Sequence, residues 1–466
     1  MKPSFQVVCE STKSLARTGK FVLKSGRSLQ VPTFLASTSR GVVPHLTPDN
    51  VARSKQTIPG VFLGAEDFFD GLPDRPIPFL KAPGAIRDLF CFPEDMPVVL
   101  STRRSVPVPS PQPNGDHLIT IMTSEGNRKL PTKLYYGFAS KFQPDILLSP
   151  ADIPNLSPGG KPGNNRRRAM ILRSEKWLTE LLAGIEDDGG INNLVDIFAP
   201  VLPGISFEHH KGYLDKLKAD FATKISGVAF WSSRSGRLSE KQAHLESKRQ
   251  RAKVDDDSDV LETNIALFAR EFPNLPRLYS NGIDTPHEIL ESVANGMDIV
   301  IADCVCGFTD AGVALDFTFP APAETGERLP LGYNLWDPCY AVDMTSFGRL
   351  VQSPTGSSYN RAYINHLLNA KEMTAWVLLQ SHNFTVIEKF YEGIRNSINQ
   401  GRFEEDVKVF NRVFGDKPDG IELRDRFKAK DTVPKVRGYT IGYNETVERT
   451  KEGVTERLND PRFKKL

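Results

Sequence analysis

The chain has 466 residues, of which 39% are apolar and 25% are charged, and its formal net charge is +2. This length suits one large barrel domain or two to three ordinary domains, and the apolar content suffices for a full core. The near-balanced charge excludes an overall field that attracts nucleic acid, so RNA binding requires local basic patches. Five scattered cysteines argue against a disulfide framework, and no apolar run approaches the roughly 20 residues of a membrane span. We expect a soluble intracellular protein.

Short apolar runs alternate with longer helical or loop segments over the first 330 residues. The first 35 residues predict a β-hairpin, with a turn at 24–27, that leads into a core strand. Eight runs have the continuous apolar character of buried strands: 33–35, 60–63, 97–100, 145–148, 195–198, 227–230, 277–279 and 298–301. The alternation predicts an α/β fold, a (β/α)8 barrel of the TIM type. An open doubly wound sheet with an appendage is the alternative.

Three parts are expected along the chain: a barrel at 1–330, a helical arm at 331–400 and a charged C-terminal extension at 401–466. Flexible insertions are expected in the barrel near 104–118, 156–168 and 233–260, because these segments are rich in proline, in glycine and proline, or in charge. The second insertion contains the basic triplet Arg166, Arg167 and Arg168. These side chains are candidates for binding nucleic-acid phosphates, although basic loops are more often plain solvated surface.

Residues 359–398 carry apolar side chains at helical spacing on both sides of His382. Ser357, Ser358 and Asn360 are suitable N-caps, and neither proline nor glycine interrupts the run before Gly393. We predict two helical segments with His382 at their joint.

This stretch contains R-A-Y-x-x-H-L-L-x-A-x-E-M followed by L-L-x-x-H-N, which resembles the zinc-subdomain helix of the tRNA-guanine transglycosylases. Further similarity to that family lies in R-T-G at 17–19, V-P-T-F at 31–34, L-T-P-D-N at 46–50, G-V-F-L-G at 60–64 and G-M-D at 296–298. The resemblance implies a barrel with an N-terminal β-hairpin, a C-terminal zinc subdomain, and active-site residues at the C-terminal ends of the strands.

The resemblance also implies a reaction in which a carboxylate attacks a ribose of tRNA and a purine is exchanged. The implied base pocket is altered in this chain. Ser101 stands at one acid position, and Arg103 and Arg104 replace two glycines whose missing side chains leave room for the base. Ala151 stands at a second acid position, with Asp152 one residue away. The two other replaced parts of the pocket are Leu202 and the segment 231–234.

The position of the nucleophilic acid implied by the resemblance falls on Ile301. Asp303 lies two residues further on, and in a strand it would point to the same face. Asp303 is therefore either a displaced nucleophile or a strand-end residue that caps the next turn.

The metal site implied by the resemblance has lost three of its four ligands. Val351, Ser353 and Gly356 stand at the three cysteine positions, and only His382 remains. Because a tetrahedral zinc ion needs about four N, S or O donors, one imidazole does not retain it. The alternatives are residual zinc binding and a metal-free joint in which His382 hydrogen-bonds to its neighbours.

Together these departures resemble the non-catalytic barrel of the eukaryotic heterodimer, which exchanges guanine for queuine at the wobble position of tRNA. The resemblance implies a catalytic subunit and tRNA as partners, with the helical arm around His382 in or near a barrel-on-barrel interface. It also implies a cytoplasmic location with peripheral attachment to the outer mitochondrial membrane. The alternatives are a self-sufficient transglycosylase that uses Asp303 and a repurposed RNA-binding scaffold.

Overall fold

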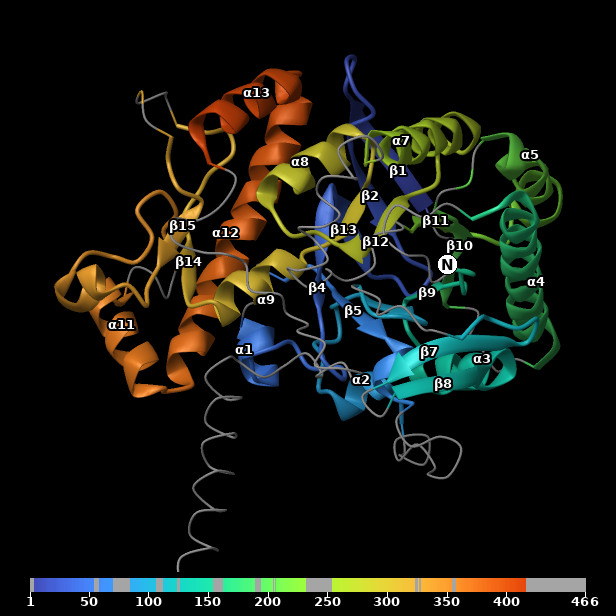
Figure 1. Ribbon diagram of the computed structural model, residues 1–466, viewed down its shortest axis with the longest axis horizontal. Helices are drawn as coiled ribbons and strands as arrows, with labels where there is room; N and C mark the ends of the chain where they lie inside the picture. The colour runs from blue at the N-terminus through green and yellow to red at the C-terminus, as the bar shows by residue number, and fades with distance from the viewer. Residues whose placement is uncertain are drawn as a thin grey trace, which may run out of the picture.

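The computed structural model describes residues 4–53, 58–69, 84–105, 112–123, 126–153, 162–188, 194–203, 205, 207–231, 254–322, 326, 328–353 and 358–415. Over these ranges the chain forms a barrel and a C-terminal unit of strands and helices (Figure 1). None of the helices in these ranges is both long enough and apolar enough to cross a membrane.

Eight parallel strands form a closed barrel in the order β10-β11-β12-β13-β4-β5-β6-β9. They are β4 (Thr33–Ser37), β5 (Val61–Gly64), β6 (Val98–Ser101), β9 (Ile146–Leu148), β10 (Asp196–Val201), β11 (Gly227–Phe230), β12 (Arg277–Gly282) and β13 (Ile299–Ile301). Nearly all their residues are buried, because inward side chains fill the barrel and outward ones meet the surrounding helices. β13 closes the ring on β4. The structure confirms the eight predicted strands and the barrel, and the open-sheet alternative is wrong.

Helices surround the barrel, and a β-hairpin is inserted after β6 (Figure 1). The helices are α1 (Pro48–Arg53), α2 (Ile86–Leu89), α3 (Thr132–Phe142), α4 (Asn164–Asp188), α5 (Phe207–Lys216), α7 (Val254–Glu271), α8 (Pro286–Ala294) and α9 (Asp303–Asp310), and the hairpin consists of β7 (Leu118–Thr123) and β8 (Gly126–Pro131). Residues 164–168 and 254–260, which the sequence assigns to flexible insertions, are helical instead, in α4 and α7. Residues 106–111, 156–161 and 233–253 of the predicted insertions lie outside the described residues.

An antiparallel sheet of β1 (Ser4–Glu10), β2 (Arg17–Val22) and β3 (Ser28–Val31) covers the N-terminal ends of the barrel strands. The pairing of β2 with β3 confirms the predicted hairpin, whose turn contains Gly26 with a φ of 89°. Arg17 forms a buried ion pair with Asp298, just before β13, with 2.6 Å between Nη2 and Oδ2. This sheet closes one end of the barrel, so a functional site belongs at the other end.

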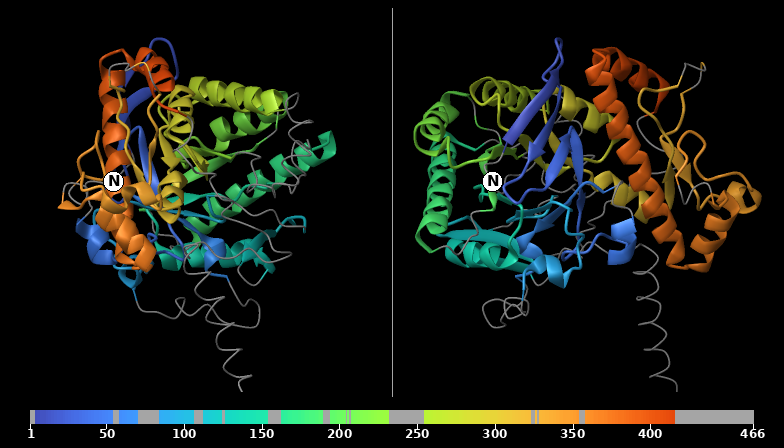
Figure 2. Two further views of the ribbon diagram at one scale, coloured as in Figure 1. Left: turned by 60° about the vertical axis from the view of Figure 1, so that its left-hand side comes forward. Right: turned by 180° about the vertical axis from the view of Figure 1, so that it is seen from behind.

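The C-terminal unit is organised around one long helix, α12 (Thr374–Asn399). Its other elements are β14 (Val313–Leu315), β15 (Gly332–Asn334), the 3-10 turn η4 (Pro338–Val342), α11 (Arg361–Ala370) and α13 (Phe403–Val413). α12 runs along the side of the barrel (Figure 2), where the rings of Phe384 and Tyr391 stack on Phe34 of β4. The pairing of β14 with β15 crosses the domain boundary that the sequence predicts at residue 330.

The joint between α11 and α12 lies at residues 371–373, and the prediction of a joint at His382 is wrong. Asn360 caps α11 as predicted, since its side chain accepts a 2.8 Å hydrogen bond from the amide of Tyr363. Lys371, with a φ of 58°, ends that helix. His382 is buried in the middle of α12, so the apolar spacing on both sides of it belongs to one continuous helix. The predicted charged extension begins with α13, and residues 416–466 lie outside the described part.

Candidate functional site

The C-terminal ends of the strands form the mouth of the barrel, where enzymes of this fold carry their active sites. Three positions at which the sequence analysis expected acids lie there: Ser101 ends β6, Ala151 follows β9 and Ile301 ends β13. All three side chains are buried. The fold therefore brings these positions to one end of the barrel, but the residues that occupy them supply no carboxylate.

The segment 101–105 lies across the mouth. It continues from β6, and the carbonyl oxygen of Ser105 accepts a 2.7 Å hydrogen bond from the amide of Gly282, the last residue of β12. β6 and β12 are four strands apart in a ring of eight, which places them on opposite sides of the barrel. All five residues of the segment are buried. The backbone thus bridges the mouth, and we call residues 101–105 the bridging segment.

Arg103 and Arg104 lie within the bridging segment, and the two residues are only 4% and 5% exposed. Arg103 donates from Nη2 to the carbonyl oxygen of Thr120 at 3.0 Å, and Arg104 donates from Nη1 to that of Met122 at 3.3 Å. Both carbonyl groups belong to β7. The two arginines therefore fasten the inserted hairpin to the bridging segment.

Two acids after β5 balance the charge of Arg104. Its Nε donates to Asp67 Oδ1, and its backbone amide donates to Glu66 Oε1 at 2.8 Å. Burial raises the pKa of the Glu66 carboxyl, and the charge of Arg104 opposes that rise. Burial also lowers the pKa of the Arg103 guanidinium. A buried cluster of this kind loses about 3–5 kcal/mol of stability when one charge is removed, because its partner is left uncompensated.

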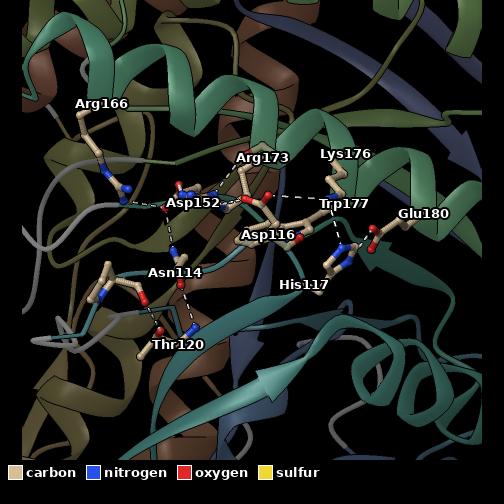
Figure 3. Close-up of polar contacts among 12 residues, drawn as sticks. Asn114, Asp116, His117, Thr120, Asp152, Arg166, Arg173, Lys176, Trp177 and Glu180 are labelled. Atoms are coloured by element: carbon tan, nitrogen blue, oxygen red, sulfur yellow. Dashed lines mark hydrogen bonds and ion pairs between the residues drawn. The ribbon is translucent and has the colours of Figure 1, made fainter.

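Asp152 forms a second charged centre beside the mouth (Figure 3). Its buried carboxylate accepts hydrogen bonds from Asn114 at 2.7 Å, from Arg166 at 2.9 Å and from Arg173. Its amide donates to the hydroxyl oxygen of Ser174 at 2.9 Å. These partners come from the segment before β7 and from α4. The one carboxylate next to an expected acid position is thus engaged in ion pairs within the chain.

The basic triplet lies at the start of α4. Successive residues of a helix point about 100° apart, so the three side chains do not share one face. Arg166 is half-buried and pairs with Asp152, Arg167 is half-buried and donates to Asn164 Oδ1 at 3.4 Å, and Arg168 is exposed. Of the three, Arg168 is the residue best placed to meet a phosphate.

Asp303 is the first residue of α9 and does not extend β13, so the argument from strand alternation fails. The N-cap of α9 is Ala302, so Asp303 occupies the first position inside the helix. Its side chain is fully buried against Gly282, where a Cβ would lie 1.6 Å from Oδ2. Gly282 is the same residue that holds Ser105 of the bridging segment. A nucleophile has to reach the ribose, and a fully buried carboxyl beside the bridging segment does not.

Three of the four positions implied for metal ligands lie close together in the C-terminal unit. Val351, Ser353 and His382 are buried, and Ser353 Oγ is 2.7 Å from His382 Nδ1. His382 Nε2 is 2.8 Å from the carbonyl oxygen of Leu315. Burial lowers the pKa of His382 to about 4, so the imidazole is neutral at pH 7. Gly356 lies outside the described residues.

These residues do not fit a zinc ion. Val351 has no donor atom, and both ring nitrogens of His382 are already hydrogen-bonded. Within the described ranges, no three histidine, cysteine or acidic side chains are grouped so that they could hold a metal. The described residues thus provide no ligand set for residual zinc binding.

Comparison with known proteins decides the family. The sequence model of a family described as queuine tRNA-ribosyltransferase matches residues 10–415, which span the barrel and the C-terminal unit. The chain belongs to the queuine tRNA-ribosyltransferase family.

Two relatives in this family align with the chain over most of its length. A Schizosaccharomyces pombe protein named queuine tRNA-ribosyltransferase accessory subunit 2 is 33% identical over 87% of this chain and 82% of its own length. A Culex quinquefasciatus protein with the same name is 22% identical over 86% of this chain and 92% of its own length. An Agrobacterium fabrum protein named queuine tRNA-ribosyltransferase is 30% identical, but over 33% of this chain and 37% of that protein. The long alignments are thus with relatives that carry the accessory-subunit name.

Sequence reasoning missed several polar residues that hold the filled mouth of the barrel together. Glu66, Asp67 and Asn114 were not singled out, nor was Arg173 in the middle of α4. One signal was available: arginines at strand ends inside a barrel need buried acids, and Glu66-Asp67 directly follows the second predicted strand. The sequence shows Asp152 next to an expected acid position, but the partners of Asp152 lie far apart in the sequence.

Proposed function

We propose that this chain is the non-catalytic accessory subunit of a queuine tRNA-ribosyltransferase heterodimer. In this role it supports the exchange of guanine for queuine at the wobble position of tRNA, with the chemistry done by the other subunit. The observation that carries the proposal is the bridging segment with its two buried arginines. Exchange requires space for a purine and an accessible carboxylate, whereas the bridging segment crosses the described mouth, and Glu66, Asp67 and Asp152 beside it are buried. The names of the two relatives that align over most of the chain support the same role.

The C-terminal unit carries the surface that we propose for the catalytic subunit. Val342 and Met344 are 84% and 73% exposed, and Tyr359 and Tyr363 are stacked at a centroid distance of 5.5 Å. Backbone hydrogen bonds from Arg361 to Thr345 and from Ala362 to Asp343 hold the two segments side by side. We call Val342, Met344, Tyr359 and Tyr363 the apolar patch. Exposed aliphatic and tyrosine side chains of this kind are typical of protein interfaces.

Contact with tRNA and location in the cell are finer parts of the proposal. We propose that the heterodimer, rather than this chain alone, positions tRNA, and that Arg168 is the member of the triplet that contributes. A cytoplasmic location with peripheral attachment to the outer mitochondrial membrane rests on the family resemblance. Cell fractionation with a tagged chain tests the location.

Association with a catalytic subunit is the first test. The purified chain and the catalytic subunit of the same cell are mixed and run on a sizing column, and we expect one peak with a 1:1 ratio. Deleting the gene for this chain should remove queuosine from tRNA. Failure of the two proteins to associate contradicts the proposal. If they do not associate and tRNA also keeps its queuosine after the deletion, the RNA-binding scaffold is favoured instead.

A further inference from the structure

A buried carboxylate organises the loop that holds two of the former ligand positions. Asp316 is 1% exposed and accepts hydrogen bonds from three successive backbone amides: Arg349 at 2.9 Å, Leu350 at 2.7 Å and Val351 at 3.1 Å. Bonds from backbone N–H groups to a carboxylate are about twice as strong as neutral ones. The side chain of Asp316 thus fixes the backbone of residues 349–351.

His382 joins the same loop to the end of β14. The carbonyl oxygen of Leu315 only accepts hydrogen bonds, so the Nε2 atom facing it carries the proton and donates. The other nitrogen, Nδ1, is then the acceptor for the hydroxyl of Ser353 at 2.7 Å. Both nitrogens are committed, and neither has a lone pair left for a metal. Leu315 and Asp316 are adjacent, so one strand end holds both the histidine and the loop.

We infer that the C-terminal unit of this chain folds and keeps its shape without zinc. The carboxylate of Asp316 and the Ser353–His382–Leu315 hydrogen bonds hold together the loop and the helix that a metal with thiolate ligands joins in the family pattern. Phe347 packs on the His382 ring at a centroid distance of 4.7 Å, and Gly348 leaves that ring room, since a Cβ there would lie 2.8 Å from Cε1. The surroundings of the imidazole are therefore filled by the chain itself.

Metal content and melting temperature of the purified full chain test this inference. The chain is produced in zinc-supplemented medium, without a metal-binding tag, and its zinc is measured by mass spectrometry. We expect far less than one zinc per chain and the same Tm with and without EDTA. About one zinc per chain, together with a Tm that falls when EDTA removes it, overturns the inference.

Variants test the role assigned to the hydrogen bonds. Asp316→Ala removes the acceptor of three amides and should lower Tm by several degrees, and Ser353→Ala should lower it by less. Asp316→Asn keeps the shape and one acceptor oxygen, so it covers the case in which the alanine variant fails to fold. Ser381→Ala, next to His382 on α12, is the matched control and should melt as the wild type does. If Asp316→Asn and Ser353→Ala also melt as the wild type does, the inference is wrong.

Discussion

The mouth of the barrel and the C-terminal unit have both departed from the family pattern, and they are filled in different ways. At the mouth, Arg103, Arg104 and Asp152 are held in buried ion pairs and charge-assisted hydrogen bonds. In the C-terminal unit, Ser353 and a neutral His382 form uncharged hydrogen bonds, and the buried carboxylate of Asp316 accepts from neutral backbone amides rather than from a cation. The difference follows from what was replaced. Glycines gave way to arginines that need acids, whereas thiolate positions gave way to small neutral side chains that need only short hydrogen bonds.

This comparison teaches where stability is most at risk. A buried ion pair that loses one partner leaves an uncompensated charge in the low-dielectric interior. A neutral hydrogen bond that loses one partner leaves a single unsatisfied polar atom. We therefore expect substitutions at the mouth to destabilise the chain more than substitutions around His382.

The largest effect is expected for Asp152→Ala. It leaves Arg166 and Arg173 without their common buried acceptor and should lower the free energy of unfolding by about 3–5 kcal/mol. Urea unfolding followed by circular dichroism measures the change. Asp116→Ala is the control, because Asp116 is exposed and pairs with the same Arg173; we expect about 1 kcal/mol or less. Equal losses in the two variants would contradict the comparison.

The pH dependence of stability tests a buried group of the barrel that is neutral, His210, beside the charged groups of the mouth. His210 of α5 is fully buried, and burial lowers its pKa from 6.5 to about 4. Its contribution to stability is complete above pH 6.5 and is lost as the pH falls toward 4, because the unfolded chain binds the proton first. The loss is about 3 kcal/mol at most. His210→Gln should flatten this part of the stability curve, and an unchanged slope would show that His210 has the same pKa in the folded and unfolded chain, which contradicts the account.

A smaller effect is expected for the apolar patch, and it should appear in assembly rather than in folding. Val342→Asp or Tyr363→Asp should raise the Kd for the catalytic subunit about tenfold or more, roughly 1.4 kcal/mol, because an apolar contact is replaced by a charge. The free energy of unfolding should change by about 0.5 kcal/mol or less at these exposed positions. Val8→Asp, on the exposed β1, is the control. Equal affinity of all three variants would place the interface elsewhere.

The barrel strands could be predicted from the sequence because continuous apolar runs bounded by polar segments are typical of strands buried on both sides. The same reasoning misplaced the joint in residues 359–398. His382 and Asn383 are polar, and the backbone carbonyl groups that accept from them, those of Leu315 and Val313, lie 67 and 70 residues away. A polar pair that is satisfied by distant backbone looks like a break when only local spacing is considered.

The candidate site was less predictable than the fold. The family pattern identified which positions had lost their acids and thiols, and the structure places those that it describes in two compact groups. The partners that fill each group could not be derived in this way. Asn114 approaches Asp152 from an insertion, and Asp316 reaches residues 349–351 across more than 30 positions of sequence. Such contacts depend on the closed fold and not on local pattern.

The most direct test of the central claim is incorporation of labelled guanine into tRNA by this chain alone, by the catalytic subunit alone and by their mixture. With a bridged mouth and a buried Asp303, the chain alone should show no incorporation above the buffer blank, and the mixture should be active. Incorporation by the chain alone that is abolished by Asp303→Asn would contradict the account and establish a self-sufficient enzyme.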